Sequence, residues 1–350
     1  MRKPFKYAAV FSAAALALSA CGGSADDETT DAATDGGTEA TSDVKVGMAY
    51  DVGGRGDQSF NDAAAAGLDQ AIEEFGIETT EATAVDGEPE SAREERLQQL
   101  VDNGYSTIIA VGFAYAQSVA KVAPENPDVH FALIDSTDAE GENIANLTFA
   151  EHEGSFLVGA AAALKSKTGH IGYVGGVQVP LIQKFEAGYV AGAKEINPDI
   201  QIDSTYLTQP PDFSGFGDPA KGKTAAEGFY QSGADVVYHA AGGSGGGVFT
   251  AAQEANKMAI GVDSDQALTA AEDVRDVIIT SMIKKLDVAV YEFLKREVDG
   301  AFEGGALEFN LAEGGVDYST TGGKVDDIKD QLDELKQKII DGEIEVPTAP

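Results

Sequence analysis

The stretch 44-VKVGMAYDVGGRGDQSFND-62 reads as a strand, a glycine-rich loop and the start of a helix in immediate succession. Its first residues are mostly apolar, three glycines follow, and Phe60 opens an amphipathic pattern. The same order returns about 125 residues later, where a strand from His170 runs through Gly175 and Gly176 into a second helix. Repeated strand–helix units are typical of a doubly wound α/β fold, and the restart predicts two similar lobes.

Apolar runs and amphipathic stretches alternate along the rest of the chain. Several runs are apolar without alternation, as expected for parallel strands that helices cover on both faces. The expected strands are Val44–Tyr50, Thr107–Val111, Val129–Ile134, Ile144–Phe149, His170–Val174, Ile202–Leu207, Val236–His239, Ala259–Val262, Val277–Thr280 and Leu307–Asn310. The expected helices are Phe60–Phe75, Ser91–Asn103, Ala116–Ala123, Ser155–Ser166, Ile182–Asn197, Ala220–Ser232, Val248–Ala255 and Lys284–Val298. Ligands of open α/β sheets bind beyond the carboxyl ends of the strands, so the cleft between two facing lobes is the expected site.

The N-terminus has the features of an export signal. Three of the first six residues are basic, and Tyr7–Ala20 is an apolar run shorter than the roughly 20 residues that span a bilayer. The run ends in Leu18-Ser19-Ala20-Cys21, which resembles the lipobox of bacterial lipoproteins and predicts lipidation of Cys21. An ordinary signal peptide with an incidental cysteine is the alternative. Since Cys21 is the only cysteine, disulfides and a catalytic thiol are excluded.

The chain is strongly acidic, with 59 acidic against 24 basic residues and a net charge of −35. Residues 22–43 hold seven acidic residues, no basic ones and no apolar residue larger than alanine, which predicts a flexible tether. The acidity excludes nucleic acid and anionic lipid headgroups as partners. It fits an extracellular or a salt-adapted protein equally well.

The loop after the first strand offers candidate ligand contacts. Ser59 and Asp62 predict a helix N-cap and capping box, which leaves Asp51 and Phe60 without a local role. Phe60 either faces the cleft as a stacking plate or packs against the core as a hydrophobic staple. Asp51 lies at the end of the strand, where ligands of such folds bind.

A second candidate is 236-VVYHAAGGSGGGV-248, a strand followed by a glycine-rich turn and a helix start. Glycines let backbone amides approach a ligand closely, and a helix N-terminus favours electron-rich groups. Asp263 follows Gly243 by 20 residues, the spacing of a dinucleotide fingerprint. A dinucleotide does not fit an exported chain, but a carboxylate there suits two vicinal hydroxyls. The alternative for Asp263 is a turn or N-cap.

Lys284 is a third candidate. It is either a donor to a ligand hydroxyl or an ordinary surface lysine.

Catalysis has little support. The motif HExxH is absent, as is any metal-spaced cluster, so neither a catalytic residue nor a metal or cofactor is expected. His239 precedes the glycine turn and is a weak candidate for ligand contact. The other histidines, His130, His152 and His170, lie far apart in sequence.

Seven motifs in order resemble the basic membrane protein family, from about Val44 to Asn310. They are DVGGRGDQSFN (51–61), VGFAYAQSVAKVAPENPDVHFALID (111–135), IGYVGGVQVPLIQKFEAGYVAGAK (171–194), GFGDPAKGK (215–223), GADVVYHAAGGSGGGV (233–248), IGVDSDQ (260–266) and ITSMIKKLDVAVY (279–291). The family's bacterial lipoproteins bind nucleosides for ABC importers. The resemblance implies a two-lobed periplasmic-binding-protein type I fold, each lobe a doubly wound, mostly parallel sheet flanked by helices. The expected lobes are 44–150 plus about 279–310, and 151–278 plus about 311–345.

The resemblance also implies which residues bind the ligand. A base lies between Phe60 and Phe216, although Phe213, three residues earlier, leaves open which ring stacks. The remaining expected residues are Asp51 for the base, Gly242, Asp263 and Lys284 for the ribose, and Asn61 and Phe113 in cleft-lining motifs.

The expected protein is a monomeric, extracytoplasmic substrate-binding protein anchored to the cell membrane through Cys21. Its expected partners are a nucleoside, with purines first, and an ABC permease with its ATPase. The absence of a Lys or Arg cluster argues against a phosphorylated ligand. The alternatives are a binding protein for a simple sugar or furanosyl signalling molecule, a surface nucleoside hydrolase, and a surface adhesin or antigen.

Overall fold

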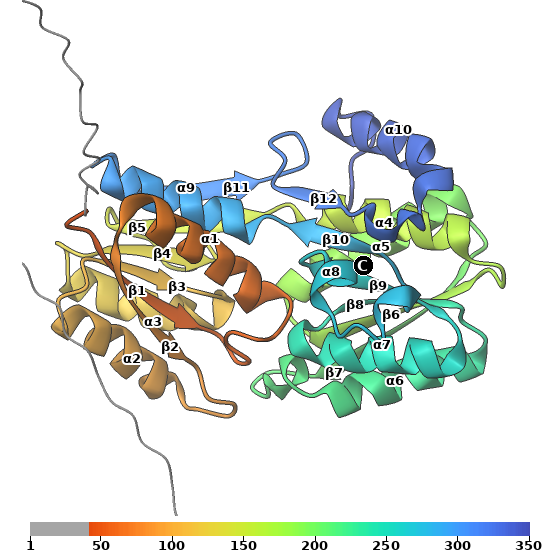
Figure 1. The fold of residues 1–350 in the computed structure, drawn as a ribbon, viewed down its shortest axis with the longest axis horizontal. Helices are drawn as coiled ribbons and strands as arrows, with labels where there is room; N and C mark the ends of the chain where they lie inside the picture. Colours follow the sequence, from red (N-terminus) through yellow and green to blue (C-terminus); the bar gives the residue numbers. More distant parts are fainter. Residues whose placement is uncertain (1–41) are drawn as a thin grey trace, which may run out of the picture. The chain divides into compact units, whose positions relative to one another are not determined.

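Residues 42–350, the part that the computed structural model describes, contain two six-stranded sheets (Figure 1). The strand orders are β11-β5-β4-β3-β1-β2 and β12-β10-β9-β8-β6-β7, so the two sheets correspond strand by strand. The restart of the sequence pattern at His170, the first residue of β6, therefore marks a second lobe with the corresponding strand order. The signal peptide, Cys21 and the acidic segment up to residue 41 lie outside the described residues.

The first sheet is parallel throughout, with helices α1 and α9 on one face and α2 and α3 on the other. Its strands are β1 Lys45–Tyr50, β2 Glu78–Thr83, β3 Thr107–Ala110, β4 His130–Ile134, β5 Ile144–Phe149 and β11 Gly305–Phe309. Its helices are α1 Phe60–Phe75, α2 Glu90–Asp102, α3 Ala116–Val122 and α9 Leu286–Val298. Because helices cover both faces, the central strands are buried along their length, which explains the apolar runs without alternation.

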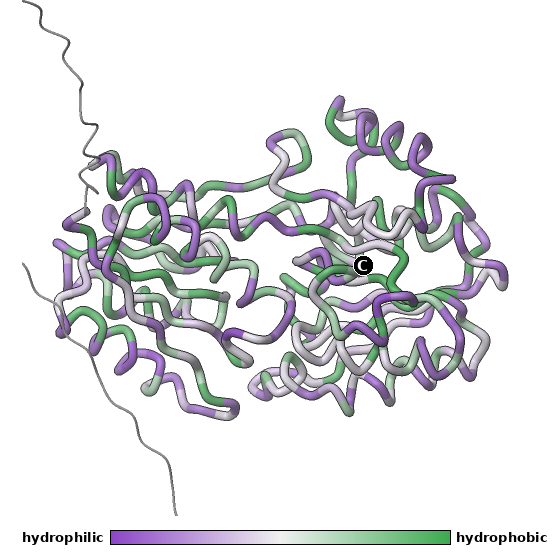
Figure 2. Tube along the Cα trace, in the orientation of Figure 1, coloured by the Kyte–Doolittle hydropathy of each residue, from purple (hydrophilic) through white to green (hydrophobic). Residues whose placement is uncertain are grey.

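The second sheet is parallel except for β12, which runs antiparallel to β10. Its strands are β6 His170–Val177, β7 Gln201–Thr208, β8 Val236–Ala240, β9 Met258–Asp263, β10 Ile278–Lys284 and β12 Val316–Tyr318. Helices α4 Glu151–Lys165 and α5 Pro180–Ile196 cover one face, and α6 Pro219–Ser232 and α7 Gly245–Ala255 cover the other. Two further helices are α8 Gln266–Thr269 and α10 Lys329–Ile340. Figure 2 shows hydrophobic colour along the strands and hydrophilic colour on the outer helices.

The chain crosses between the two sheets three times, after β5, after β10 and between β11 and β12. The expected return to the first lobe at about residue 279 is wrong. Ile278–Lys284 is a strand that pairs with β9 and β12, so the return comes with α9 at Leu286. The apolar run of β10 fits a buried central strand of either sheet, and only the pairing partners decide between them.

Four elements have no counterpart among the expected strands and helices. They are β2, β12, α8 and α10. The sequence of β2 is ETTEAT, and its side chains are half-buried or exposed because it is an edge strand. Polar edge strands and short strands carry little hydrophobic pattern, so the signal on which the expectations depended is weak there.

Candidate functional site

One pocket between the lobes is lined by all eight residues that the sequence predicted. These residues are Asp51, Phe60, Asn61, Phe113, Phe216, Gly242, Asp263 and Lys284. The carboxyl ends of β1, β4, β8, β9 and β10 all contribute to the lining. The site therefore lies where open α/β sheets place their ligands. Residues that the sequence did not predict include Asp57, Asp135, Leu181, Ile182 and Phe185.

The aromatic lining comes from both lobes. Phe60 is the first residue of α1, while Phe216 ends a short 3-10 helix, Ser214–Phe216, before α6. A Cβ on Gly176 would lie 2.5 Å from the Phe216 ring, so only glycine at position 176 lets this ring lie against β6. Phe113 contacts Phe216 edge to face, at 6.3 Å between ring centroids. Phe60 therefore does not act only as a core staple, because it lines the pocket.

Phe213 and Phe216 lie differently with respect to the pocket. Phe216 lines the pocket and Phe213 does not. Phe213 contacts Phe113 edge to face at 5.9 Å, and the Arg93 guanidinium carbon lies 6.0 Å from its ring centroid. Phe213 thus supports Phe113 from outside, which leaves Phe216 as the ring available for stacking.

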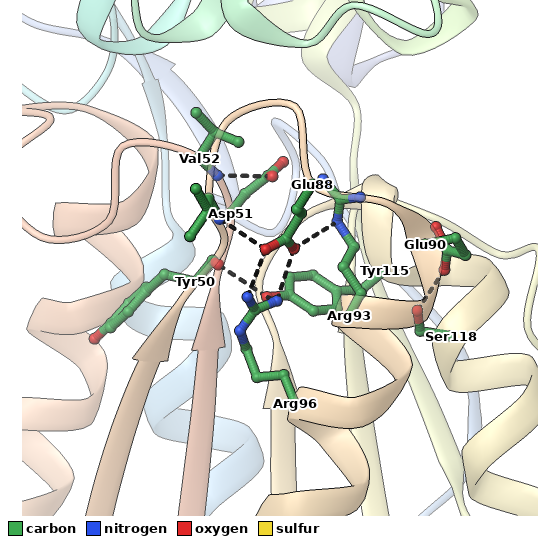
Figure 3. Close-up of polar contacts among 10 residues, drawn as sticks. Tyr50, Asp51, Val52, Glu88, Glu90, Arg93, Arg96, Tyr115 and Ser118 are labelled. Carbon is green, nitrogen blue, oxygen red and sulfur yellow. Dashed lines mark hydrogen bonds and ion pairs between the residues drawn. The ribbon is translucent and has the colours of Figure 1, made fainter.

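Asp51 directly follows β1 and lies beside a buried group of charged residues (Figure 3). Its Oδ1 accepts a hydrogen bond from the Val52 amide at 2.8 Å. Glu88 pairs with Arg96 through contacts of 2.6 and 2.8 Å, and its carboxylate lies 3.7 Å from Nε of Arg93. Burial raises the pKa of Asp51 to about 6, although the Val52 hydrogen bond and the two arginines favour the carboxylate.

Lys284 is the centre of a buried charge cluster, not a surface lysine. Its Nζ lies 2.6 Å from Asp135 Oδ2 and 3.1 Å from Glu151 Oε1. Burial lowers the pKa of Lys284, but these two carboxylates outweigh burial and hold the pKa above its ordinary value. Burial also raises the pKa of Asp135 to about 7, with Lys284 acting in the opposite direction. Lys284 is therefore a cation fixed at the floor of the pocket.

Asp135 and Glu151 are site residues that the sequence reasoning missed. Asp135 follows β4 and Asp263 ends β9, and these two strands occupy corresponding places in the two sheets. Both residues have positive φ, 67° for Asp135 and 63° for Asp263. Non-glycine residues rarely adopt this conformation, and it often marks a functional position. The available signal was an aspartate directly after the apolar run of β4.

Asp263 is neither the N-cap of α8 nor an exposed turn residue. The N-cap position is Asp265, and Asp263 is 7% exposed at the end of β9. Its Oδ2 accepts a hydrogen bond of 2.8 Å from the Ser59 hydroxyl. Burial raises the pKa of Asp263 to about 6, while Lys284 and Ser59 favour the ionised form. The carboxylate thus lines the pocket with one oxygen already bound.

The capping box predicted for Ser59 and Asp62 is wrong. Ser59 occupies the N-cap position but makes no side-chain cap hydrogen bond. Asp57 accepts from the backbone amides of Ser59, Asn61 and Asp62 at 2.9, 2.9 and 3.1 Å. Asp62 accepts from the amides of Gly56 and Gln58. A carboxylate two residues before the N-cap therefore takes over the capping, because the glycine-rich loop folds it back over the helix end.

Asn61 lies at the same helix start, 2% exposed. Its Nδ2 donates to Asp57 Oδ2 at 3.0 Å. Within residues 42–350 its Oδ1 is buried and has no hydrogen-bond partner. An unpaired amide oxygen in the lining of a pocket is available to a ligand donor.

The glycine turn after β8 serves packing as well as the pocket. Gly242 has φ 52° and lines the pocket. A Cβ on Gly245 would lie 1.9 Å from the His239 ring, so α7 packs directly on this histidine. His239 is fully buried, and burial lowers its pKa to about 4. It does not line the pocket, so the suggested ligand contact of His239 is wrong.

Residues 42–350 contain no group of three or more His, Cys, Asp or Glu side chains placed to hold a metal ion. In the same range, none of the helices combines the length and apolar character that a membrane crossing requires.

Fold and site together define a two-lobed solute-binding protein. A crystal structure of an ABC transporter solute-binding protein from Aeropyrum pernix K1 matches with a TM-score of 0.76 and 34% identity, over 87% of this chain and 93% of that one. The Caulobacter myo-inositol binding protein shares the fold, with a TM-score of 0.61 at 15% identity, over 83% and 96% of the two chains. The periplasmic-binding-protein type I architecture is thereby confirmed.

The chain belongs to the Bmp family of PnrA-like ABC transporter substrate-binding proteins, which it matches over residues 44–349. It is 36% identical to the ABC transporter nucleoside-binding protein BmpA of Lactococcus lactis subsp. cremoris, over 87% of this chain and 90% of the relative. It is 35% identical to the CD4+ T-cell-stimulating antigen of Listeria innocua, over 97% and 96% of the two chains. The resemblance drawn from seven motifs is confirmed.

Proposed function

We propose that this protein captures nucleosides, purine nucleosides first, and delivers them to an ABC permease and its ATPase. The observation that carries the proposal is the convergence of Phe60, Phe216, Asp263 and Lys284 on one pocket between the lobes. Aromatic faces suit a flat base, and a carboxylate beside an ammonium suits a vicinal diol. The name of the Lactococcus relative gives independent support for a nucleoside.

The base stacks between Phe60 and Phe216, which contributes about 1–3 kcal/mol. Asp51 and the unpaired oxygen of Asn61 lie at the same pocket and bind the polar edge of the base. The ribose hydroxyls bind Asp263, Lys284 and the backbone at Gly242, with Phe113 closing the side of the pocket. Hydrogen bonds to the charged groups contribute roughly 1.5–3 kcal/mol each, less the cost of ordering and closing the lobes. The net of about −8 kcal/mol corresponds to a Kd near 1 μM.

Ligand contacts from both lobes favour the closed arrangement, which the permease recognises. Phe60 lies on α1 of the first lobe, whereas Phe216 and Asp263 belong to the second. A ligand held by only one lobe does not shift the equilibrium between open and closed forms. The division of the stacking pair between lobes thus couples binding to closure.

A nucleotide fits the pocket poorly. Among the lining residues in the described part of the chain, Lys284 is the one cation, and Asp135 and Glu151 already neutralise it. Asp51, Asp57 and Asp263 add negative charge to the lining. A phosphate brought there meets repulsion in a site of low dielectric constant.

Calorimetric titration of the purified protein with inosine, guanosine, adenosine, cytidine, uridine and ribose tests the proposal. We expect micromolar or tighter binding of at least the purine nucleosides and much weaker binding of ribose. Equal affinity for ribose and inosine would instead establish a sugar-binding protein. Release of free base during incubation would establish a hydrolase, and no binding of any of them would favour an adhesin or antigen.

Membrane attachment is proposed to occur through a lipid on Cys21, outside the described residues. The protein then acts on the outer side of the cell membrane as a monomer. Cys21→Ser should release the chain from the membrane fraction and abolish incorporation of labelled fatty acid. Retention of the variant in that fraction would contradict the anchor.

A further inference from the structure

Ser59 and Asp263 form a hydrogen bond between the two lobes. Ser59 immediately precedes α1 on the first sheet, and Asp263 ends β9 of the second. The hydroxyl donates to Asp263 Oδ2 at 2.8 Å, and the two residues are 0% and 7% exposed. The ligand-facing carboxylate of the second lobe is thus held by a side chain of the first.

The Ser59 hydroxyl is free to make this bond because Asp57 caps the helix. An N-cap serine ordinarily accepts from a backbone amide of the first helical turn. Here the Asp57 carboxylate accepts from the amides of Asn61 and Asp62 instead. Removal of the Ser59 hydroxyl therefore costs α1 no cap hydrogen bond. Its effect falls on the 2.8 Å bond to Asp263 and on a longer contact of 3.4 Å with the Val262 carbonyl.

Other hydrogen bonds cross between the lobes at the same place without involving the Asp263 carboxylate. The Ser264 hydroxyl donates to the Ser59 carbonyl at 3.0 Å. The Gln266 amide donates to the Gln58 carbonyl, also at 3.0 Å. These bonds join the lobes through the backbone of the first lobe. They hold the lobes together without orienting the Asp263 carboxylate, so contact between the lobes and orientation of the carboxylate can be tested separately.

A carboxylate recognises two vicinal hydroxyls only when its plane is fixed relative to them. The Ser59 bond fixes one oxygen of Asp263 and leaves the other for the ligand. We propose that Ser59 is a positioning residue that orients Asp263 for the ribose diol when the lobes close. The inference rests on the proposed nucleoside function. It means that a ribose is discriminated from a deoxyribose only in the closed form, because the orienting group comes from the opposite lobe.

Three variants test this role: Ser59→Ala removes the hydroxyl, Ser59→Thr keeps it, and Ser264→Ala is the matched control that removes another hydroxyl from the same contact. Calorimetry gives the Kd of each for guanosine and for 2′-deoxyguanosine. We expect Ser59→Ala to weaken guanosine binding about tenfold and 2′-deoxyguanosine binding less than about threefold, since loss of a hydrogen bond to a charged group has roughly this effect. Ser59→Thr should keep the wild-type ratio of the two Kd values, and Ser264→Ala should leave that ratio unchanged.

Ser59→Gly removes the same hydroxyl, and glycine is tolerated at an N-cap position. This variant shows whether an effect of Ser59→Ala comes from a folding defect specific to alanine. Thermal melting without ligand shows whether each variant is folded. An unchanged ratio of Kd values in both hydroxyl-less variants would overturn the positioning role. Equal weakening of both ligands by Ser59→Ala and Ser264→Ala would assign Ser59 to lobe contact alone and overturn it also. A wild-type protein that binds neither nucleoside would overturn the proposed function itself.

Discussion

Lys284 Nζ lies 2.6 Å from Asp135 Oδ2, and this ion pair joins the two lobes at the floor of the pocket. Asp135 follows β4 of the first lobe, and Lys284 ends β10, where the chain crosses back to the first lobe. Glu151 completes the cluster at the start of α4, directly after the first crossing. A buried cation is therefore anchored at two of the three connections between lobes.

Replacement of Lys284 should destabilise the protein strongly. Lys284→Met leaves the Asp135 carboxylate buried without a cation and leaves Glu151 only its 3.6 Å contact with Lys184. Breaking a buried ion pair in this way costs about 3–5 kcal/mol. The free energy of unfolding from denaturant titration measures the loss. Lys285→Met is the matched control, since in the described residues Lys285 makes only backbone hydrogen bonds, to Gly315 and Ala289. It should change stability by less than about 0.5 kcal/mol. Equal stability of the two variants would contradict the cluster.

Asp51 should make stability depend on pH. Burial raises its pKa from 3.8 to about 6, so the folded protein binds this proton more tightly than the unfolded chain does. The associated stability is complete below about pH 4 and is lost as pH rises through about 6. Asp51→Asn removes this titration. The free energy of unfolding of the variant relative to wild type should rise by on the order of 1–3 kcal/mol between pH 4 and pH 7. A difference independent of pH would show that the Asp51 carboxylate titrates normally.

The two phenylalanines before α6 should differ in their effect on binding. Phe216→Ala removes a pocket face and should weaken inosine binding at least about tenfold, the value of one stacking contact. Phe213→Ala removes a ring that contacts Phe113 from outside and should weaken binding less than about threefold. Calorimetric titration of both variants measures the contrast. A larger loss of affinity in Phe213→Ala than in Phe216→Ala would show that Phe213, and not Phe216, stacks on the base.

Asp57 should be the residue that caps α1. Asp57→Ala leaves the amides of Ser59, Asn61 and Asp62 without their acceptor, and loss of a helix cap costs about 0.5–2 kcal/mol. Chemical denaturation measures the change. Asp57→Asn keeps an acceptor oxygen and should recover part of the stability. Unaltered stability in Asp57→Ala would mean that other groups or water satisfy the helix end.

Sequence patterns predicted the strands other than β2 and β12, most helices and eight residues of the pocket lining. The apolar runs of β3, β4 and β5 need no tertiary information, because strands covered on both faces are apolar throughout. The carboxyl ends of parallel strands meet at one edge of a sheet. Residues at those ends, such as Asp51 and Asp263, were therefore expected together, and they line one pocket.

Tertiary structure alone decided which partners those residues have. Ser59 bonds to a carboxylate 204 positions away, and Lys284 pairs with an aspartate 149 positions away. Local spacing carries no information about contacts at such separations. It assigned Ser59 to its nearest amides as a cap and left Lys284 open between ligand and solvent. The relative placement of the two lobes sets both contacts, and that placement follows from the packing of the whole chain.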